Sequence, residues 1–307
     1  MNTVAMMTAV ELGLIYTLLT LGVFISYRIL DIPDLTVDGT FTLGAATSAI
    51  LTLAGHPYLA ILAAFGAGIL AGATTAFLQT KLKVQPILAG ILTMTGLYSI
   101  NIMVMGNKSN VSLLGDETLF TKAKAFLGFK ETATIVAVII VLVCVIMIYA
   151  FLHTKLGLSI RATGDNEDMV RSSSVNVDLM KIIGLGLANG LVGISGALIA
   201  QSEAYVDITM GTGMVVIGIA SLIMGEVVVD FVVKQRSIGT HLIAAILGSI
   251  VYRIIIALAL DNNISASSMK LISSLIVIVI ISIPLLKSKI KAIMTTINND
   301  QGGSKAC

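Results

Sequence analysis

The 307-residue sequence contains few charged residues, and this scarcity indicates the class of protein. Asp, Glu, Lys and Arg together make up 12% of the chain, whereas soluble domains carry roughly 25%. Hydrophobic residues make up 56%, and the mean hydropathy is +0.99. Apolar stretches of about 20 residues are long enough to cross a lipid bilayer, and the chain has many. We therefore predict an integral membrane protein of the all-α class that contacts the lipid bilayer.

Cysteine and histidine are also scarce. The two cysteines, one inside an apolar run and one at the end of the chain, provide neither a disulfide framework nor a metal cluster. The three histidines have no ligand spacing, so no metal site is predicted. The first eleven residues contain no Lys or Arg, and the positively charged region that opens a secretory signal is therefore missing. The first apolar run is expected to be retained as a span.

Several functional motifs are absent. The chain has no G-x-x-x-x-G-K-[ST] phosphate-binding loop, so it is not predicted to hydrolyse ATP itself. It has no H-E-x-x-H sequence, no Ser/His/Asp constellation and no stretch resembling a selectivity filter. Its basic residues are dispersed, which does not favour nucleic-acid binding. We expect no enzyme, no bound cofactor and no nucleic-acid partner.

The hydropathy pattern predicts about nine transmembrane helices, within a range of eight to ten, in one membrane domain over residues 1–307. Gly66 to Ala73 and Gly184 to Gly196 are dense in small residues, which permits close helix crossings. The predicted spans are 9–27, 39–54, 58–80, 84–105, 132–152, 182–200, 214–232, 238–260 and 269–286.

The basic residues predict the orientation in the membrane. Cytoplasmic loops of membrane proteins carry an excess of Lys and Arg. Linkers that hold 13 of the 19 Lys and Arg share one side of the predicted bundle, which places the N-terminus outside and the C-terminus in the cytoplasm. The basic tail, 287–307, is either an amphipathic helix on the inner leaflet or a topological anchor. These cytoplasmic linkers are 28–38, 81–83, 153–181, 234–236 and 287–307.

A short internal repeat divides the chain into halves at about 9–152 and 182–286. Residues 34–46 and 207–220 both read Asp, Leu or Ile, Thr, and Val or Met, followed by glycines. In the predicted topology the first copy begins inside and the second outside. Inverted repeats with interrupted helices are common in transporters, where the interruptions line the transport path. The alternative is a chance match, because Gly and small apolar residues recur in such chains.

Polar residues at the two copies of the repeat are candidates for a translocation path. A carboxylate in lipid is costly, so it is expected to face a water-filled cavity, a partner or the interface. Alternatively, Asp38 caps the span that follows it, and Asn189, like Asn101 and Gln201, bonds between helices. The candidate path residues are Asp34, Thr36, Asp38, Gly39, Asn189, Asp207 and Thr209.

The polar stretch 153–181 is predicted to form a cytoplasmic loop that contains a short helix. Asp165 or Asn166 can cap this helix, and acidic residues follow in its first turn, where they complement the helix dipole. Met169 and Val170 give the helix an apolar edge. Such a helix is either a docking element for a soluble partner or an ordinary connection between spans.

The order of these segments resembles the permeases of the branched-chain amino acid and ribose class of ATP-binding cassette (ABC) importers. The sequence D-L-T-V-D-G at 34–39 is similar to the D-L-[ST]-V-G segment of the sugar members. R-A-T-G-D-N at 161–166, followed by Val175 and Asn176, is similar to the cytoplasmic coupling region of the family. Ser174 stands where the family usually has Gly. The resemblance covers about residues 10–290. Over this range the amino-acid sequence is most similar to a Gram-positive branch of the family that includes proposed tryptophan or tyrosine importers.

The resemblance implies a function in the bacterial plasma membrane. It implies a permease subunit that forms the path for a small solute, most plausibly an amino acid, together with a second permease copy and an extracytoplasmic solute-binding protein. ABC ATPase subunits would dock at the cytoplasmic face and use ATP. An ion-gradient-driven secondary transporter is the alternative, although the spans offer few ionisable residues for coupling. The residues that the resemblance assigns to ATPase coupling are Arg161, Gly164, Asp165, Asn166, Met169, Val170 and Asn176.

Overall fold

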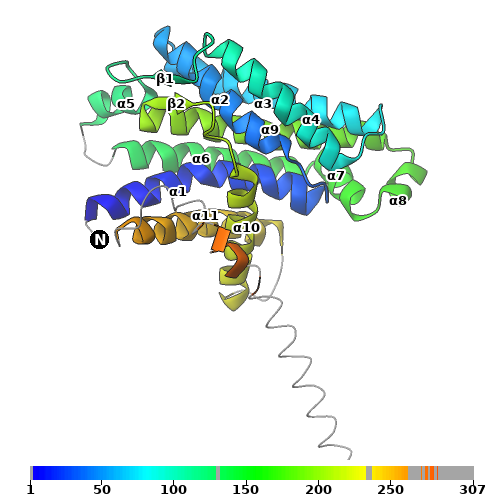
Figure 1. The fold of residues 1–307 in the computed structure, drawn as a ribbon. Helices are drawn as coiled ribbons and strands as arrows, with labels where there is room; N and C mark the ends of the chain where they lie inside the picture. Colours follow the sequence, from blue (N-terminus) through cyan, green and yellow to red (C-terminus); the bar gives the residue numbers. More distant parts are fainter. Residues whose placement is uncertain are drawn as a thin grey trace, which may run out of the picture.

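The computed structural model describes residues 3–128, 132–232, 237–261, 271, 274–275, 277–279 and 282. In this part of the chain, long helices form a bundle, with two short strands at one end (Figure 1). In chain order the elements are α1 (Thr3–Val23), the π-helix η1 (Phe24–Ile29), α2 (Thr36–Leu53), α3 (Pro57–Thr80), α4 (Pro86–Val104), β1 (Asn110–Ser112), α5 (Leu119–Leu127), α6 (Thr132–Leu152), α7 (Lys155–Asp165), α8 (Glu167–Ser172), α9 (Val177–Glu203), β2 (Tyr205–Asp207), α10 (Met214–Val232) and α11 (Ile238–Asp261).

The prediction of an all-α membrane protein is confirmed. Six helical segments in the described part of the chain are long and apolar enough to span a bilayer. Helices α2 and α10 coincide with two further predicted spans, 39–54 and 214–232. The last predicted span, 269–286, lies outside the described residues apart from isolated positions, and the tail 287–307 lies outside them entirely. The total of nine spans therefore stays a prediction. The six segments are Ala5–Ile29, Pro57–Thr80, Pro86–Val104, Thr132–Leu152, Val177–Glu203 and Ile238–Asp261.

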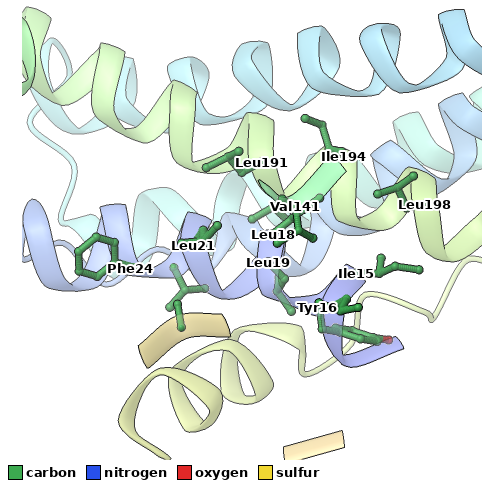
Figure 2. Close-up of a cluster of buried hydrophobic side chains, with 14 of the residues drawn as sticks. Ile15, Tyr16, Leu18, Leu19, Leu21, Phe24, Val141, Leu191, Ile194 and Leu198 are labelled. Carbon is green, nitrogen blue, oxygen red and sulfur yellow. The ribbon is translucent and has the colours of Figure 1, made fainter. Parts of the chain in front are cut away.

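Helices α1 and α9 form the centre of the bundle. In the most apolar 18-residue stretch of each, 78% of the residues are buried for the segment that begins with α1 and 83% for α9. In the other four segments the corresponding share is 22–39%. Helix α9 packs against α2 and α3, and α1 packs against α9, α11 and α6. Figure 2 shows the cluster of buried aliphatic and aromatic side chains through which these helices contact one another. The labelled members include Leu18 and Leu21 on α1, Val141 on α6, and Leu191 and Leu198 on α9.

The peripheral helices expose their apolar residues on the outside. On α4 and α6, the exposed side chains include Leu92, Met103, Leu142 and Met147. In water, an apolar surface of this extent would be unfavourable, whereas lipid tails are as apolar as these side chains. The pattern is that of helices that face a bilayer on one side and the protein core on the other.

Glycines let the central helices approach one another closely. A Cβ atom added to Gly44 on α2 would lie 2.1 Å from the carbonyl oxygen of Gly193 on α9. A Cβ atom added to Gly68 on α3 would lie 2.3 Å from the carbonyl oxygen of Asn189. The close crossings predicted from the small-residue segments are therefore present, and only residues without a side chain fit there.

Residues 106–131, which connect the predicted spans 84–105 and 132–152, carry structure that the sequence did not suggest. Strand β1 pairs in antiparallel fashion with β2, which follows α9, and Asn110 lies opposite Asp207. Gln201 at the end of α9 accepts a hydrogen bond from the backbone N–H of Leu119 at 2.7 Å and donates to Ser48 Oγ at 3.0 Å. The predicted role of Gln201, bonding between helices, is confirmed.

Candidate functional site

A buried polar network surrounds Asp34, in the non-helical segment between η1 and α2. Its Oδ1 accepts a hydrogen bond from the backbone N–H of Thr36 at 2.9 Å, and its Oδ2 accepts one from Asn189 Nδ2 at 2.6 Å. Asn189 Oδ1 in turn accepts from Thr40 Oγ1 at 2.8 Å, and the hydroxyls of Thr36 and Thr75 are 2.7 Å apart. These five residues, here called the Asp34 network, join α2, α3 and α9.

The Asp34 network is enclosed by the helices. Asp34 is 5% exposed, and Thr36, Thr40, Thr75 and Asn189 are fully buried. The prediction that Asn189 bonds between helices is confirmed, and Asn101 likewise donates to the carbonyl oxygen of Gly39 at 3.1 Å. In this conformation the three predicted path residues of the network are therefore held by protein groups, and their place on a translocation path stays a prediction.

Asp38 links the two copies of the repeat. Its Oδ2 accepts a hydrogen bond from the N–H of Gly213 at 2.8 Å, and its Oδ1 accepts one from the N–H of Val215 at 2.9 Å. The neighbouring Thr42 Oγ1 accepts a hydrogen bond from the N–H of Gly211 at 3.0 Å. Because α10 begins at Met214, the Asp38 carboxylate stabilises the start of that helix.

The prediction that Asp38 caps its own span is wrong. Helix α2 begins at Thr36, and its N-cap residue, Leu35, makes no side-chain hydrogen bond. Asp38 therefore already lies in the first turn of α2, and its carboxylate accepts hydrogen bonds from the start of α10 instead. No sequence pattern indicated this partner, because it depends on how α2 and α10 are packed.

The loss of the Asp38 carboxylate is expected to loosen the start of α10. In Asp38→Ala, the N–H groups of Gly213 and Val215 lose their acceptors, which should lower the free energy of unfolding by about 1–3 kcal/mol. Asp38→Asn, which keeps one acceptor oxygen, should lose less. Thermal unfolding of the detergent-solubilised variants measures both effects, and equal stability of Asp38→Ala and the unchanged chain would contradict this role.

Asp207 and Thr209 repeat the local geometry of Asp34 and Thr36 at the other end of α9. Asp207 Oδ1 accepts hydrogen bonds from the backbone N–H of Thr209 at 2.8 Å and from its hydroxyl at 2.5 Å. Thr209 is exposed, whereas Thr36 is buried. The two Asp-x-Thr segments thus form the same turn in different surroundings, while the inverted orientation of the two halves stays a prediction.

The predicted coupling region forms two helices, α7 and α8, where the sequence predicted one. Asn166 is the residue that caps α8, because its Oδ1 accepts a hydrogen bond from the N–H of Met169 at 3.0 Å. Met169 is 63% exposed, whereas Val170 is 4% exposed and faces inward. The exposed edge of α8 is therefore narrower than predicted, and Val170 contributes to internal packing.

The remaining predicted coupling residues have distinct positions. Gly164 lies against η1, where an added Cβ atom would come within 1.8 Å of the carbonyl oxygen of Ile29. Asp165 is exposed at the end of α7, and Arg161 is half-buried on the same helix. Asn176 caps α9 by accepting a hydrogen bond from the N–H of Leu179 at 3.1 Å. Gly164 therefore joins the coupling region to the segment that leads to Asp34.

Ser174, between α8 and α9, has a left-handed backbone conformation with φ of 61°. Glycine adopts this conformation without the steric cost that a Cβ atom imposes. Ser174→Gly is therefore expected to stabilise the protein by about 0.5–1 kcal/mol, offset in part by the greater freedom of glycine in the unfolded chain. Ser173→Gly is the matched control: Ser173 has φ of −86°, so this change should destabilise. A lower melting temperature for Ser174→Gly would contradict the prediction.

Glu167 of α8 forms two ion pairs, one within α8 and one to α9. Glu167 Oε1 accepts a hydrogen bond from Arg171 at 2.7 Å, within α8, and Glu167 Oε2 accepts one from Lys181 Nζ of α9 at 2.6 Å. The Lys181 ammonium, followed by Arg171, holds the pKa of the Glu167 carboxyl below its usual value. The pairs are therefore complete at neutral pH, and they are lost only as the pH falls through this lowered pKa.

Sequence reasoning missed Thr40, Thr75 and the Glu167–Lys181 pair. Threonines in apolar helices are common and usually bond to the carbonyl of the preceding turn, as Thr75 also does at 3.3 Å. Thr36 and Thr40 are four residues apart, which puts both on one helix face. This spacing was the only feature of the sequence that indicated a shared role for them in the Asp34 network.

Six long apolar segments, matching Asp-x-Thr hydrogen bonds ahead of α2 and α10, and the capped helix α8 between the halves define a multi-pass membrane protein. The family model for the permease component of branched-chain amino acid transport systems matches residues 5–282. The chain belongs to this family. It is accordingly an ABC transporter permease subunit, and the alternative of an ion-driven secondary transporter is set aside.

Individual relatives agree with this membership. The chain is 36% identical to the tyrosine transport system permease protein of Clostridioides difficile, over 87% of this chain and 86% of that protein. It is 29% identical to the ribose import permease protein RbsC of Escherichia coli K12, over 70% and 67% of the two chains. Among solved structures, PsaBC from Streptococcus pneumoniae in complex with Fab matches with a TM-score of 0.51 at 13% identity, over 90% of this chain and 89% of that one. This last likeness is one of fold.

Proposed function

We propose that the chain is the permease of an ABC importer for an amino acid and that its first candidate substrate is tyrosine. The observation that carries this proposal is the 36% identity to a tyrosine transport system permease over 87% of the chain. The ribose import permease is more distant, at 29% identity over 70% of the chain. Sugars are therefore the second candidate class.

The proposed path runs between the two halves of the chain, past the Asp34 network and the Asp38 contact with α10. Both sites hold polar groups at the starts of interrupted helices, which is where transporters place their solute sites. Two copies of the permease, identical or sister chains, would enclose the path. An extracytoplasmic solute-binding protein would deliver the solute to the face that carries β1, α5 and β2.

The proposed ATPase contact lies at the opposite face, on α7 and α8. Met169 is exposed on α8, Asp165 is exposed at the end of α7, and Arg161 is half-buried on α7. This assignment makes the N-terminus external, and together with the predicted span 269–286 it implies a cytoplasmic C-terminus. The partner subunits bind and hydrolyse ATP, and this chain needs no cofactor of its own. ATP and solute would then bias the same equilibrium between outward-open and inward-open states.

Solute uptake tests the proposal. The permease is expressed with its companion ATPase and binding protein in a bacterial strain that lacks aromatic amino acid uptake, and entry of radiolabelled L-tyrosine is measured. We expect ATP-dependent uptake that excess unlabelled tyrosine abolishes, with phenylalanine, tryptophan, leucine and ribose as competitors to rank the alternatives. Competition by ribose alone would move the proposal to sugars, and uptake that persists without the ATPase would overturn the importer function.

A further inference from the structure

Glu167 holds two cations with its two carboxylate oxygens, and these cations belong to different helices. Arg171 lies on α8 itself, four residues further on, and is 60% exposed, whereas Lys181 lies in the second turn of α9 and is 21% exposed. The bond to Arg171 therefore stays within α8. The bond to Lys181, at 2.6 Å, is the one that ties α8 to α9.

Helix α9 extends from this tie to the Asp34 network. It is continuous from Val177 to Glu203, and its most apolar window is 83% buried. Asn189 follows Lys181 by eight residues, which corresponds to about 12 Å along a helix. Because α9 packs closely against α2 and α3, a displacement at its first turns reaches the Asn189–Asp34 hydrogen bond through a rigid element rather than through a loop.

A second contact connects the same region to the other side of the Asp34 network. Gly164 at the end of α7 packs against the carbonyl oxygen of Ile29, the last residue of η1. The segment 30–35 that carries Asp34 begins directly after it. Helices α7 and α8 thus contact α9, which carries Asn189, and α7 also contacts η1, which leads directly into the segment that carries Asp34.

We propose that Glu167 is a positioning residue that couples the movement of α8 to α9, and through α9 to the Asp34 network, by means of its ion pair with Lys181. This inference rests on the proposed docking of ATPase subunits at α8. Glu167 itself need not contact the ATPase. Its function is to make α8 and α9 move as one unit when the ATPases close.

Two neighbouring variants separate this function from simple charge loss. Lys181→Gln removes the interhelical partner of Glu167, and Arg171→Gln removes its partner within α8. Each variant deletes one positive charge next to the same carboxylate. We expect Lys181→Gln and Glu167→Gln to lower the number of solute molecules imported per ATP hydrolysed by about fivefold, the effect of losing one partly exposed ion pair from a coupled equilibrium. Arg171→Gln should leave this ratio unchanged.

A distance measurement tests the mechanical link directly. Spin labels are attached at Ser172→Cys on α8 and Glu203→Cys at the far end of α9, in a chain with Cys144→Ala and Cys307→Ser. In the complex with ATPase, the label distance should stay the same when ATP and vanadate are added. In Lys181→Gln, but not in Arg171→Gln, the distance should change on addition of ATP. The reversed pair Glu167→Lys, Lys181→Glu should restore the unchanged distance.

The outcomes separate this inference from the proposed function. Absence of ATPase from the wild-type complex would overturn the proposed function and this inference with it. If ATPase is bound, equal behaviour of Lys181→Gln and Arg171→Gln would overturn the inference alone. A fall in bound ATPase that accounts for the whole loss of transport in Glu167→Gln would likewise overturn it, because Glu167 would then act in docking and not in coupling.

Discussion

Gly68→Ala is expected to destabilise the protein strongly, whereas Gly66→Ala, two residues earlier on the same helix, should have almost no effect. At Gly68 the new Cβ atom would lie 2.3 Å from the carbonyl oxygen of Asn189 and 2.9 Å from the Cα of Gly190. At Gly66 it would meet no atom within 4 Å. Because the obstruction is backbone, no side chain can rotate away, and α3 and α9 must separate.

The expected loss for Gly68→Ala is about 3 kcal/mol or more, the upper range for an overpacked core. Gly66→Ala should match the wild type or gain slightly, since Ala favours helix over Gly. Yield of monodisperse protein after detergent extraction and the melting temperature measure the difference between the two variants. Similar melting temperatures would show that α3 and α9 do not cross as closely as described.

Asn189→Ala is expected to be the most damaging change to the buried polar network. It removes the donor to Asp34 Oδ2 and the acceptor of the Thr40 hydroxyl, so that a carboxylate oxygen loses its partner in the interior. Breaking a buried polar contact that involves a potential charge costs about 3–5 kcal/mol. Solute uptake should fall along with stability, because the network lies on the proposed path.

The matched control is Asn101→Ala. Asn101 is 1% exposed and donates a single hydrogen bond, to the carbonyl oxygen of Gly39, so this change should cost only about 1 kcal/mol. A double-mutant cycle that combines Asn189→Ala with Asp34→Ala tests the contact between these two side chains. The losses in the free energy of unfolding from the two single variants should be far from additive in the double variant, as expected for residues in direct contact. Additive effects would show that the two side chains act independently.

The membrane class and the positions of most helices could be predicted from the sequence, because lipid requires long apolar segments whose backbone bonds are internal. Residue type alone restricted the N-cap residue of α8 to Asp165 or Asn166, and in the structure Asn166 caps the helix. Local rules of this kind need only a few neighbouring residues, which is why they succeeded here.

Contacts between distant segments could not be predicted in this way. The carboxylate of Asp38 stabilises α10, and β1 pairs with β2, because the bundle brings segments together that lie far apart in the chain. The inward position of Val170 likewise depends on how α8 packs against the bundle. Ser174 is an intermediate case, since the resemblance marked it as standing where the family usually has Gly, but only the structure showed the left-handed backbone conformation that glycine would favour there.

Co-purification with the companion ATPase tests the proposed importer function most directly. The wild type is compared with Arg161→Glu, Met169→Glu, which changes the exposed surface of α7 and α8, and with Phe126→Glu. Phe126, 90% exposed on α5 at the opposite end of the bundle, is the control for an added carboxylate on an exposed apolar position. We predict that the wild type and Phe126→Glu retain the ATPase and that the double variant, still folded, loses it. Equal retention by all three would contradict docking at α7 and α8, and absence of ATPase from the wild type would contradict the importer function itself.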